Sequence, residues 1–256
     1  YTAKAHHIGS AFSCIDILTS VFFNYLDTDI KNFKDKNSDT FCLSKGHAAL
    51  ALYVTLSKKG FFSKKDLKEN FLTNGGKLGG HPDRYSLPGV EINSGSLGHS
   101  LSVGAGIALA AKNDDHNKKT VVLLGDGECN EGMIWEAALF SSHNHLNNLI
   151  AIIDLNGLQG LGTTNQVMNL NSLNNKFESF GWFTQEIDGH NFHQINNSMK
   201  QCGIKNKMPN IIIAKTTKGK GVSSMENTLK SHYETLTKER YNETLDELRQ
   251  FTNNEF

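Results

Sequence analysis

The sequence has no excess of charge of either sign, no long apolar run and no closely spaced pair of cysteines. Its 256 residues contain 26 Lys and Arg against 26 Asp and Glu, so no overall electrostatic field would draw the chain to nucleic acid or to an anionic membrane. The longest apolar runs are about half a dozen residues, too short for a transmembrane helix. No signal-type segment opens the chain. We therefore expect neither nucleic acid nor a membrane as a partner.

The cysteines are few and widely separated, at Cys14, Cys42, Cys129 and Cys202, with no Cys-x-x-Cys spacing. Such cysteines are typical of reduced, structural thiols rather than of a disulfide framework or a metal site. We therefore expect a cytoplasmic protein. The chain begins at Tyr1 rather than at Met, and we expect that some N-terminal residues lie outside this numbering.

Short β-type runs alternate with helical patterns along most of the chain. The expected strands are 121–124, 149–153, 182–187 and 210–215, and the expected helices are 14–25, 47–58, 98–112, 131–146, 172–180 and 192–202. This alternation predicts a single α/β domain with a mainly parallel sheet covered by helices on both faces. The length suits one domain. A polar amphipathic helix over 234–251 forms part of a helical tail, 234–256, and no second domain is expected.

The clearest chemical pattern is G-D-G-E-C-N-E-G at 125–132, followed by the triplet Asp154-Leu155-Asn156. Asp126 and Asn156 each follow a β-type run, and parallel strands of a β-α-β unit bring such residues to one edge of the sheet. A carboxylate and an amide oxygen there suit magnesium, which commonly shares its oxygen ligands with phosphates. Glycines beside Asp126 let the backbone approach a diphosphate closely. Taken singly, each motif could instead be an ordinary turn after a strand.

These motifs resemble the thiamine-diphosphate motif of transketolases, and further blocks occur in the order typical of that family. The blocks are H-I-G-S at 7–10, L-S-K-G-H-A-A at 43–49, G-G-H-P at 79–82, G-S-L-G-H at 95–99, and K-G-K-G-V at 218–222 with M-E-N at 225–227. The resemblance runs from Ala3 to Tyr233. It implies the thiamine-diphosphate-binding fold over 1–256. It also implies thiamine diphosphate and a divalent metal, Mg²⁺ or else Ca²⁺ or Mn²⁺, as cofactors.

The resemblance also assigns roles to individual residues. It implies a metal site made by Asp126, Asn156 and the backbone carbonyl of Leu158. It implies that the cofactor is bound by His47, Gly95, Leu97, His99, Gly127, Asn156 and His232. The catalytic residues that it implies are His7, His47, His81 and His232. Histidine suits this work because imidazole can donate or accept a proton near neutral pH. Around His232 the sequence Ser231-His232-Tyr233 departs from the family pattern, in which Trp precedes and Gly follows the histidine.

Several other polar residues have two interpretations. Lys218 and Lys220 could flank phosphates or simply be solvated. Glu131 and Glu136 match glutamates at the subunit interface of transketolases, whereas a glutamate at the start of a helix is also favoured by the helix dipole. His6 could narrow the mouth of the site. The histidines expected at the surface or at helix caps are His143, His145, His190 and His193.

The resemblance further implies that the glutamate which activates the cofactor lies on the next domain, and nothing after Tyr233 resembles that domain. We therefore expect the N-terminal subunit of a split transketolase-like enzyme, or a fragment of a longer chain. With a partner subunit carrying the pyrimidine-binding domain, in an α2β2 heterotetramer, it would transfer a two-carbon ketol unit. The donor would be a ketose and the acceptor an aldose, as sugars or sugar phosphates.

Other functions fit the sequence less well. A thiamine-diphosphate-dependent carboligase of a specialised sugar pathway would use the same motifs, and a non-catalytic assembly subunit is a further alternative. A nicotinamide-dependent dehydrogenase is disfavoured because no G-x-G-x-x-G follows the first β-type run. A hydrolase is disfavoured because G-H-S-L-S at 98–102 lacks the closing glycine of a nucleophile elbow.

Overall fold

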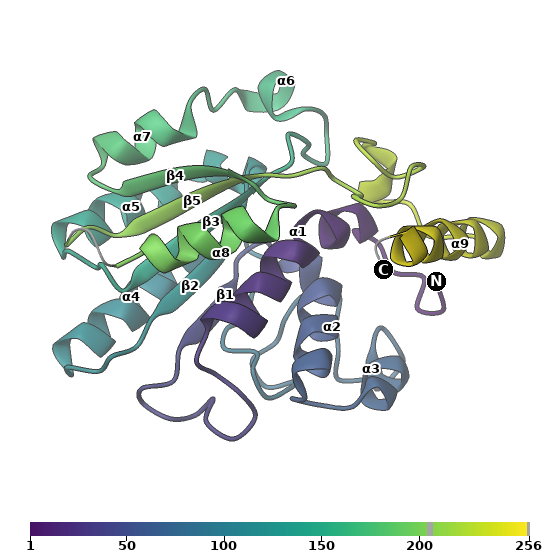
Figure 1. The fold of residues 1–256 in the computed structure, drawn as a ribbon, viewed down its shortest axis with the longest axis horizontal. Coiled ribbons are helices and arrows are strands. Elements are labelled where there is room, and N and C mark those ends of the chain that lie inside the picture. The colour runs from purple at the N-terminus through teal and green to yellow at the C-terminus, as the bar shows by residue number, and fades with distance from the viewer. Residues whose placement is uncertain (204–206, 255–256) are drawn as a thin grey trace.

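The computed structural model describes residues 1–203 and 207–254, and at its centre lies a five-stranded parallel sheet (Figure 1). The strands are β1 (Thr40–Leu43), β2 (Thr120–Gly125), β3 (Leu149–Leu155), β4 (Phe183–Asp188) and β5 (Asn210–Lys215). Their order is β1-β2-β3-β5-β4, and every neighbouring pair is parallel. The predicted α/β class is confirmed. Strand β1 was not expected from the sequence.

The helices match most of the expected ranges. They are α1 (Ile8–Ser20), α2 (Ala49–Lys59), α3 (Lys64–Asn70), α4 (His99–Asn113), α5 (Gly132–His143), α6 (Thr164–Met168), α7 (Leu173–Ser179), α8 (Phe192–Gln201) and α9 (Lys238–Asn254). The helix expected over 14–25 begins earlier, at Ile8, and continues into a π-helical turn, Val21–Tyr25. Helices α3 and α6 were not expected. The tail helix begins at Lys238 rather than at 234, and residues 255 and 256 lie outside the described part.

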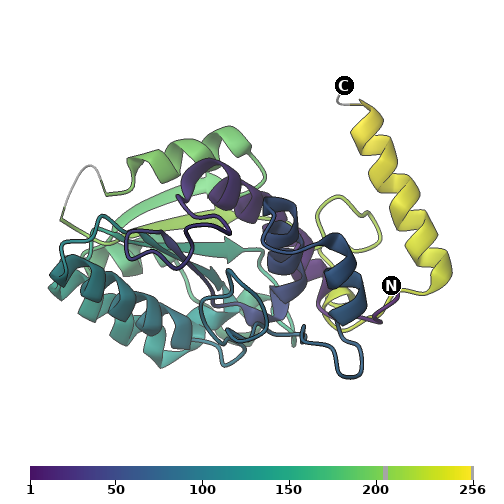
Figure 2. The same ribbon diagram turned by 90° about the horizontal axis from the view of Figure 1, so that it is seen from below.

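Alternate side chains of each strand face two different helical layers, which Figure 2 shows on opposite sides of the sheet. Val121 and Leu123 of β2 belong to the core cluster that contains α1, α2 and α8, whereas Val122 and Leu124 belong to the cluster with α4, α5 and α7. All six residues of β2 are buried. Burial on both faces explains why β1, β2, β3 and β5 are almost continuously apolar. The edge strand β4 (Phe183–Asp188) is half-buried or exposed and is mostly polar.

The segment Ile8–Tyr25 is long and apolar enough to cross a membrane by length and composition alone. In the fold, Ile17, Leu18 and Val21 are fully buried, and they belong to the core cluster that also contains residues of α2 and Val121 and Leu123 of β2. Packing in the domain core therefore accounts for the apolar composition of this segment.

The strands end at a common edge, where the chain places polar residues. Ser44 follows β1, Asp126 follows β2, Asn156 follows β3 and Thr216 follows β5. Ligands of open parallel sheets bind at this carboxyl-end edge, and the functional site described below lies here.

Two glycines of α4 test how tightly this helix packs on the sheet. A β-carbon on Gly104 would lie 2.5 Å from Cγ2 of Val122, whereas one on Gly106 would meet nothing within 4 Å. We expect Gly104→Ala to lower the free energy of unfolding by roughly 1–3 kcal/mol through overpacking. Gly106→Ala, in the same helix, should raise it by up to about 1 kcal/mol because alanine favours helix. Urea denaturation measures both, and equal effects would contradict close packing at Gly104.

Candidate active site

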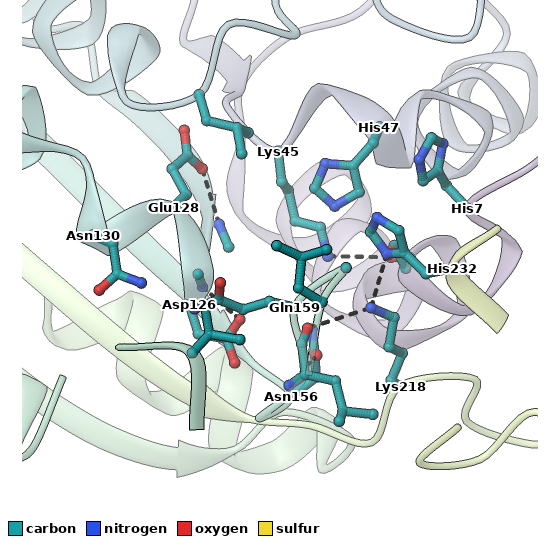
Figure 3. Close-up of a pocket in the computed structure, with 18 of the residues that line it drawn as sticks. His7, Lys45, His47, Asp126, Glu128, Asn130, Asn156, Gln159, Lys218 and His232 are labelled. Carbon is teal, nitrogen blue, oxygen red and sulfur yellow. Dashed lines mark hydrogen bonds between the residues drawn. The ribbon is translucent and has the colours of Figure 1, made fainter. Parts of the chain in front are cut away.

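A cavity of about 530 Å³ lies at the carboxyl-end edge of the sheet (Figure 3). Its volume is in the usual range for cofactor sites. The predicted site residues in its lining are His7, His47, His81, Gly95, Leu97, Asp126, Gly127, Asn156, Leu158 and His232. The fold therefore brings residues from both ends of the chain and from the motif between them into one space.

His99 is the predicted site residue that the structure does not bring to the cavity. It is the first residue of α4, its side chain is exposed, and it is absent from the lining. Its Nδ1 lies 3.2 Å from the carbonyl oxygen of Leu97, two residues earlier. The local turn thus satisfies this ring outside the cavity, whereas Leu97 itself lines it.

The three predicted metal ligands lie in two loops that are fastened together by Asp126. Its carboxylate accepts hydrogen bonds from the backbone N–H of Gly127 at 2.7 Å and of Gly157 at 2.6 Å. The Asn156 amide oxygen accepts from the N–H of Leu158 at 3.1 Å. Burial, together with the nearby negative charge of Asp154, raises the pKa of Asp126 to about 6. The buried carboxylate of Asp126 is thus hydrogen-bonded to the loop that carries Asn156 and Leu158, and all three residues line the cavity.

Lys218 supplies a buried positive charge next to the loop that carries Asn156 and Leu158. Its Nζ donates to the carbonyl oxygen of Leu158 at 3.3 Å and lies 3.0 Å from Nδ1 of His232. An ammonium group only donates, so Nδ1 of His232 accepts. Burial, and then repulsion from Lys45, lowers the pKa of Lys218 to about 8. Lys220, which the sequence grouped with it, is exposed and lies 3.8 Å from Glu226.

Four histidines that line the cavity form a cluster of rings. The ring centroids of His7 and His232 are 4.7 Å apart, those of His7 and His47 5.5 Å, and those of His7 and His81 6.2 Å. Burial is the main reason that the pKa falls to about 4 at His7 and about 3 at His232, and it also lowers the pKa of His47 well below its usual value. These three imidazoles are therefore neutral at pH 7, each with one donor and one acceptor nitrogen.

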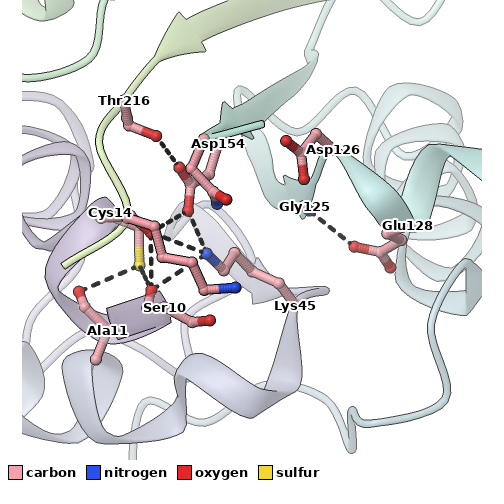
Figure 4. A network of polar contacts seen from close by, with 12 residues as sticks. Ser10, Ala11, Cys14, Lys45, Gly125, Asp126, Glu128, Asp154 and Thr216 are labelled. Atoms are coloured by element: carbon pink, nitrogen blue, oxygen red, sulfur yellow. Dashed lines mark hydrogen bonds and ion pairs between the residues drawn. The ribbon is translucent and has the colours of Figure 1, made fainter. Parts of the chain in front are cut away.

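A buried ion pair lies beneath the cavity, between Lys45 and Asp154 (Figure 4). Lys45 Nζ also donates to the carbonyl oxygen of Ser10 at 3.2 Å, and Asp154 accepts from the hydroxyls of Ser13 and Thr216. Burial alone would lower the pKa of Lys45 and raise that of Asp154, but their mutual attraction reverses both shifts. The network joins α1, the segment after β1, the end of β3 and the segment after β5.

Glu128 forms a second buried anchor, inside the motif at 125–132. Its carboxylate accepts from the N–H of Gly98 at 2.8 Å, from the N–H of Gly125 at 3.0 Å and from the hydroxyl of Ser44. Burial raises its pKa in spite of these hydrogen bonds. Glu128 therefore holds the 95–98 loop against the end of β2, and so positions Gly95 and Leu97.

The sequence did not predict a role for several of these residues, although most of them lie inside or near the matched sequence blocks. Lys45 and Glu128 stand within the matched blocks, but they occupy positions to which no role was assigned. His190 was expected at the surface or at a cap, yet it is half-buried, with Nδ1 2.8 Å from an Asp16 oxygen and Nε2 accepting from the N–H of Thr217. The segment that carries Lys218 is thus tied to α1.

The cavity contains polar atoms that suit a bound diphosphate. Among the described residues, the Gln159 Nε2 donor is buried without a hydrogen-bond partner, and Gln159 lines the cavity. A β-carbon on Gly127 would lie 2.7 Å from Cγ of Gln159, so any other residue there would require the Gln159 side chain to shift. An unpaired amide donor, a buried lysine and three oxygen ligands together fit a diphosphate bridged by a divalent cation.

Comparison with known proteins identifies the family of the chain. Residues 1–255 match the family described as the transketolase, thiamine diphosphate binding domain. The chain is 44% identical over 248 residues to an apulose-4-phosphate transketolase subunit of Phocaeicola vulgatus, across 97% of this chain and 88% of that protein. It is 36% identical over 242 residues to a 6-deoxy-6-sulfo-D-fructose transketolase subunit of a Clostridium species, across 94% and 88%.

A solved structure gives the same result for the fold. The crystal structure of transketolase from Campylobacter jejuni superposes with a TM-score of 0.89 at 33% identity, covering 96% of this chain and 39% of that chain. The chain therefore spans most of the subunit-type relatives but about two fifths of this transketolase. The resemblance read from the sequence blocks is confirmed, and the chain belongs to the transketolase family as its thiamine-diphosphate-binding part.

Proposed function

We propose that this chain is the cofactor-binding subunit of a two-subunit transketolase, which transfers a two-carbon ketol unit from a ketose to an aldose. The observation that carries the proposal is the meeting of the Asp126 and Asn156 oxygens with four histidines in one cavity. One end of this cavity suits a metal-bound diphosphate, and the other suits the hydroxyl groups of a sugar. Relatives of nearly the same length that are named as subunits support the division between two chains.

Particular residues would hold the cofactor. Asp126, Asn156 and the Leu158 carbonyl would bind Mg²⁺, which prefers such oxygen ligands and leaves positions for phosphates. The Lys218 ammonium would contact the phosphate oxygens. The Gly127 N–H would share its hydrogen bond to the Asp126 carboxylate with a phosphate oxygen. When bound, thiamine diphosphate supplies the nucleophilic carbon of its thiazolium ring.

The histidine cluster would handle the sugar. Because His7 and His47 are neutral at pH 7, each can accept a hydrogen bond from a hydroxyl and donate one to a carbonyl or hydroxyl oxygen. His232 is also neutral, but its Nδ1 accepts from Lys218, so its Nε2–H is left to donate to an oxygen of the sugar. Such groups can orient a ketose and move protons to and from its oxygens. His81 lies 6.2 Å from His7, ring to ring, and completes the cluster on its exposed side.

The partner subunit would carry the pyrimidine-binding domain, and two copies of each chain would form the enzyme. Glu131 and Glu136 are exposed on and beside α5, where they are available to a partner. The relatives described above are named for unusual sugars, which supports a role in a specialised sugar pathway. A carboligase of such a pathway is the alternative function, since it would use the same cofactor site. All four cysteines are unpaired and buried, which supports a reducing, cytoplasmic location.

Removal of the charged metal ligand should weaken cofactor binding. We expect Asp126→Ala to reduce the magnesium-dependent affinity for thiamine diphosphate by at least about a hundredfold, since loss of even an outer-shell partner of a metal typically costs 10–100-fold. Isothermal titration calorimetry measures the affinity. Asp126→Asn, which keeps the shape but not the charge, should behave similarly, and Asp35→Ala, at an exposed position, should bind normally. Unchanged affinity in both Asp126 variants would contradict the metal site.

A histidine at the exposed side of the cluster should affect turnover more than cofactor binding. In the complex with the partner subunit, we expect His81→Ala to lower kcat by about a hundredfold, the lower end of the usual acid–base contribution. Its affinity for thiamine diphosphate should stay close to the wild-type value. His143→Ala, an exposed histidine on α5, is the matched control. A wild-type kcat for His81→Ala would remove this residue from the site.

The chain alone should be inactive. With thiamine diphosphate and Mg²⁺ but without the partner, we expect no measurable ketol transfer, because the activating glutamate would come from the other chain. Adding the purified partner should restore turnover, with a stoichiometry near one to one. A coupled assay for the aldose product measures both states, and robust turnover by the isolated chain would refute a divided site.

A further inference from the structure

Tyr233 stands at the mouth of the cavity, at the position where the sequence departs from the family pattern. Its side chain is 57% exposed, and its ring lies edge-on to that of His232, with centroids 4.6 Å apart. The ring of His7 is 6.3 Å away. Tyr233 thus covers the outer side of two of the four clustered histidines.

The backbone of Tyr233 is held in place from two sides. Its N–H donates to the Lys230 carbonyl at 3.1 Å, and its carbonyl oxygen lies 2.5 Å from Nδ1 of His6. His6, which was expected to narrow the mouth itself, is exposed and absent from the cavity lining. Its contact with the Tyr233 carbonyl oxygen holds the backbone of that residue at the mouth of the cavity.

The tip of the tyrosine ring reaches the loop on the other side of the cavity, at Gly160. A β-carbon on Gly160 would overlap the Tyr233 hydroxyl oxygen and would lie 3.3 Å from Cζ of the same ring. Gly160 does not have a positive φ, so its backbone would accept other residues. Lack of space beside the tyrosine is therefore the reason for a glycine here.

The contact between these two residues separates the cavity from a neighbouring groove. The groove has a volume of about 450 Å³ and is lined by Gly160, Leu229, Lys230, Tyr233 and Glu234. Tyr233 and Gly160 also line the inner cavity. Without the ring, the two spaces would join, and Lys230 would provide a positive charge at the far end of the combined space.

We propose that Tyr233, seated against Gly160, determines substrate length by closing the sugar cavity on this side. The inference rests on the proposed function, in which the reacting end of the sugar lies among the histidines. A chain that extends past His232 meets the tyrosine ring, so the site favours short ketose phosphates and disfavours long ones. Apolar walls discriminate between substrates through the room that they leave, and an aromatic ring adds a flat apolar surface for sugar C–H groups.

The test compares a five-carbon with a seven-carbon donor in the complex with the partner subunit. The probes are xylulose 5-phosphate and sedoheptulose 7-phosphate, and the readout is the ratio of their kcat/KM values. We expect Tyr233→Ala to shift this ratio toward the seven-carbon donor by at least about tenfold, the lower end of what pocket contacts achieve. Affinity for thiamine diphosphate should not change. Tyr233→Phe, which keeps the ring, should keep the wild-type ratio, and so should Tyr85→Ala, which removes a tyrosine that is 82% exposed elsewhere.

A double-mutant cycle identifies Gly160 as the seat of the ring. Gly160→Ala should displace Tyr233 and alter the ratio in the wild-type background, whereas in the Tyr233→Ala background the same methyl group should have no effect. Such non-additivity is the mark of direct contact. Gly160→Ala alone provides a second route to the answer if Tyr233→Ala is poorly folded.

The outcomes separate the two proposals. The length inference is overturned if the wild-type complex transfers a ketol unit and both Tyr233→Ala and Gly160→Ala keep the wild-type ratio of kcat/KM values. The proposed function is then left intact. A wild-type complex that transfers no ketol unit from either donor overturns the proposed function and this inference with it. The inference is supported if the ratio of kcat/KM values changes in Tyr233→Ala and stays at the wild-type value in Tyr233→Phe.

Discussion

The site depends on the ion pair between Lys45 and Asp154, because both groups are almost completely buried and each neutralises the other. Removing one partner of such a pair typically costs about 3–5 kcal/mol, since the remaining charge is left in a medium of low polarity. The pair also joins segments that are far apart in the chain. Lys45 precedes the 3-10 turn with His47, Asp154 is two residues before Asn156, and Ser13 lies on the helix that begins next to His7. Histidines and metal ligands are thus positioned by one interaction.

The low polarity of this buried region has a second effect, which is to lower the pKa of the histidines. Three of the four clustered histidines lose affinity for protons through burial, and the lysines beneath them add to that loss. A positively charged cluster would compete with a metal ion and would be unable to accept hydrogen bonds from hydroxyl groups. Lys45 is neutralised by Asp154, so the proposed contact with a diphosphate falls to Lys218.

Much of the fold could be predicted from the sequence, and the reasons lie in particular elements. Strand β5 was predicted with its observed bounds, 210–215, because Ile211, Ile212 and Ile213 form a buried run between polar segments. Strand β1 was missed: its four residues, Thr40–Leu43, are too few to show a period. Helix α6 was missed because its capping box at Thr163 follows a glycine-rich loop and no apolar stripe.

The site was predictable as a set of blocks, but its internal contacts were not. Asp126 and Asn156 carry recognisable chemistry, so spacing and resemblance brought them together. Lys45 and Glu128 lie inside the same blocks, yet only three-dimensional contacts show that they hold the loops in place. His99 was placed in the cavity on resemblance alone, and a turn of the backbone at Gly98, with a φ of 86°, sends it outside. The identity of the residues does not predict such a change in the direction of the backbone.

The left-handed backbone of His7, with φ near 60°, is uncommon for a residue with a β-carbon. Its N–H donates to the carbonyl oxygen of His232 at 3.0 Å, across almost the full length of the polypeptide. Closing so long a loop costs conformational entropy, which the contacts at its ends must offset. If the His7 and His232 segments separated, the two rings would part and the cavity would open, whereas the hydrogen-bonded sheet would stay intact.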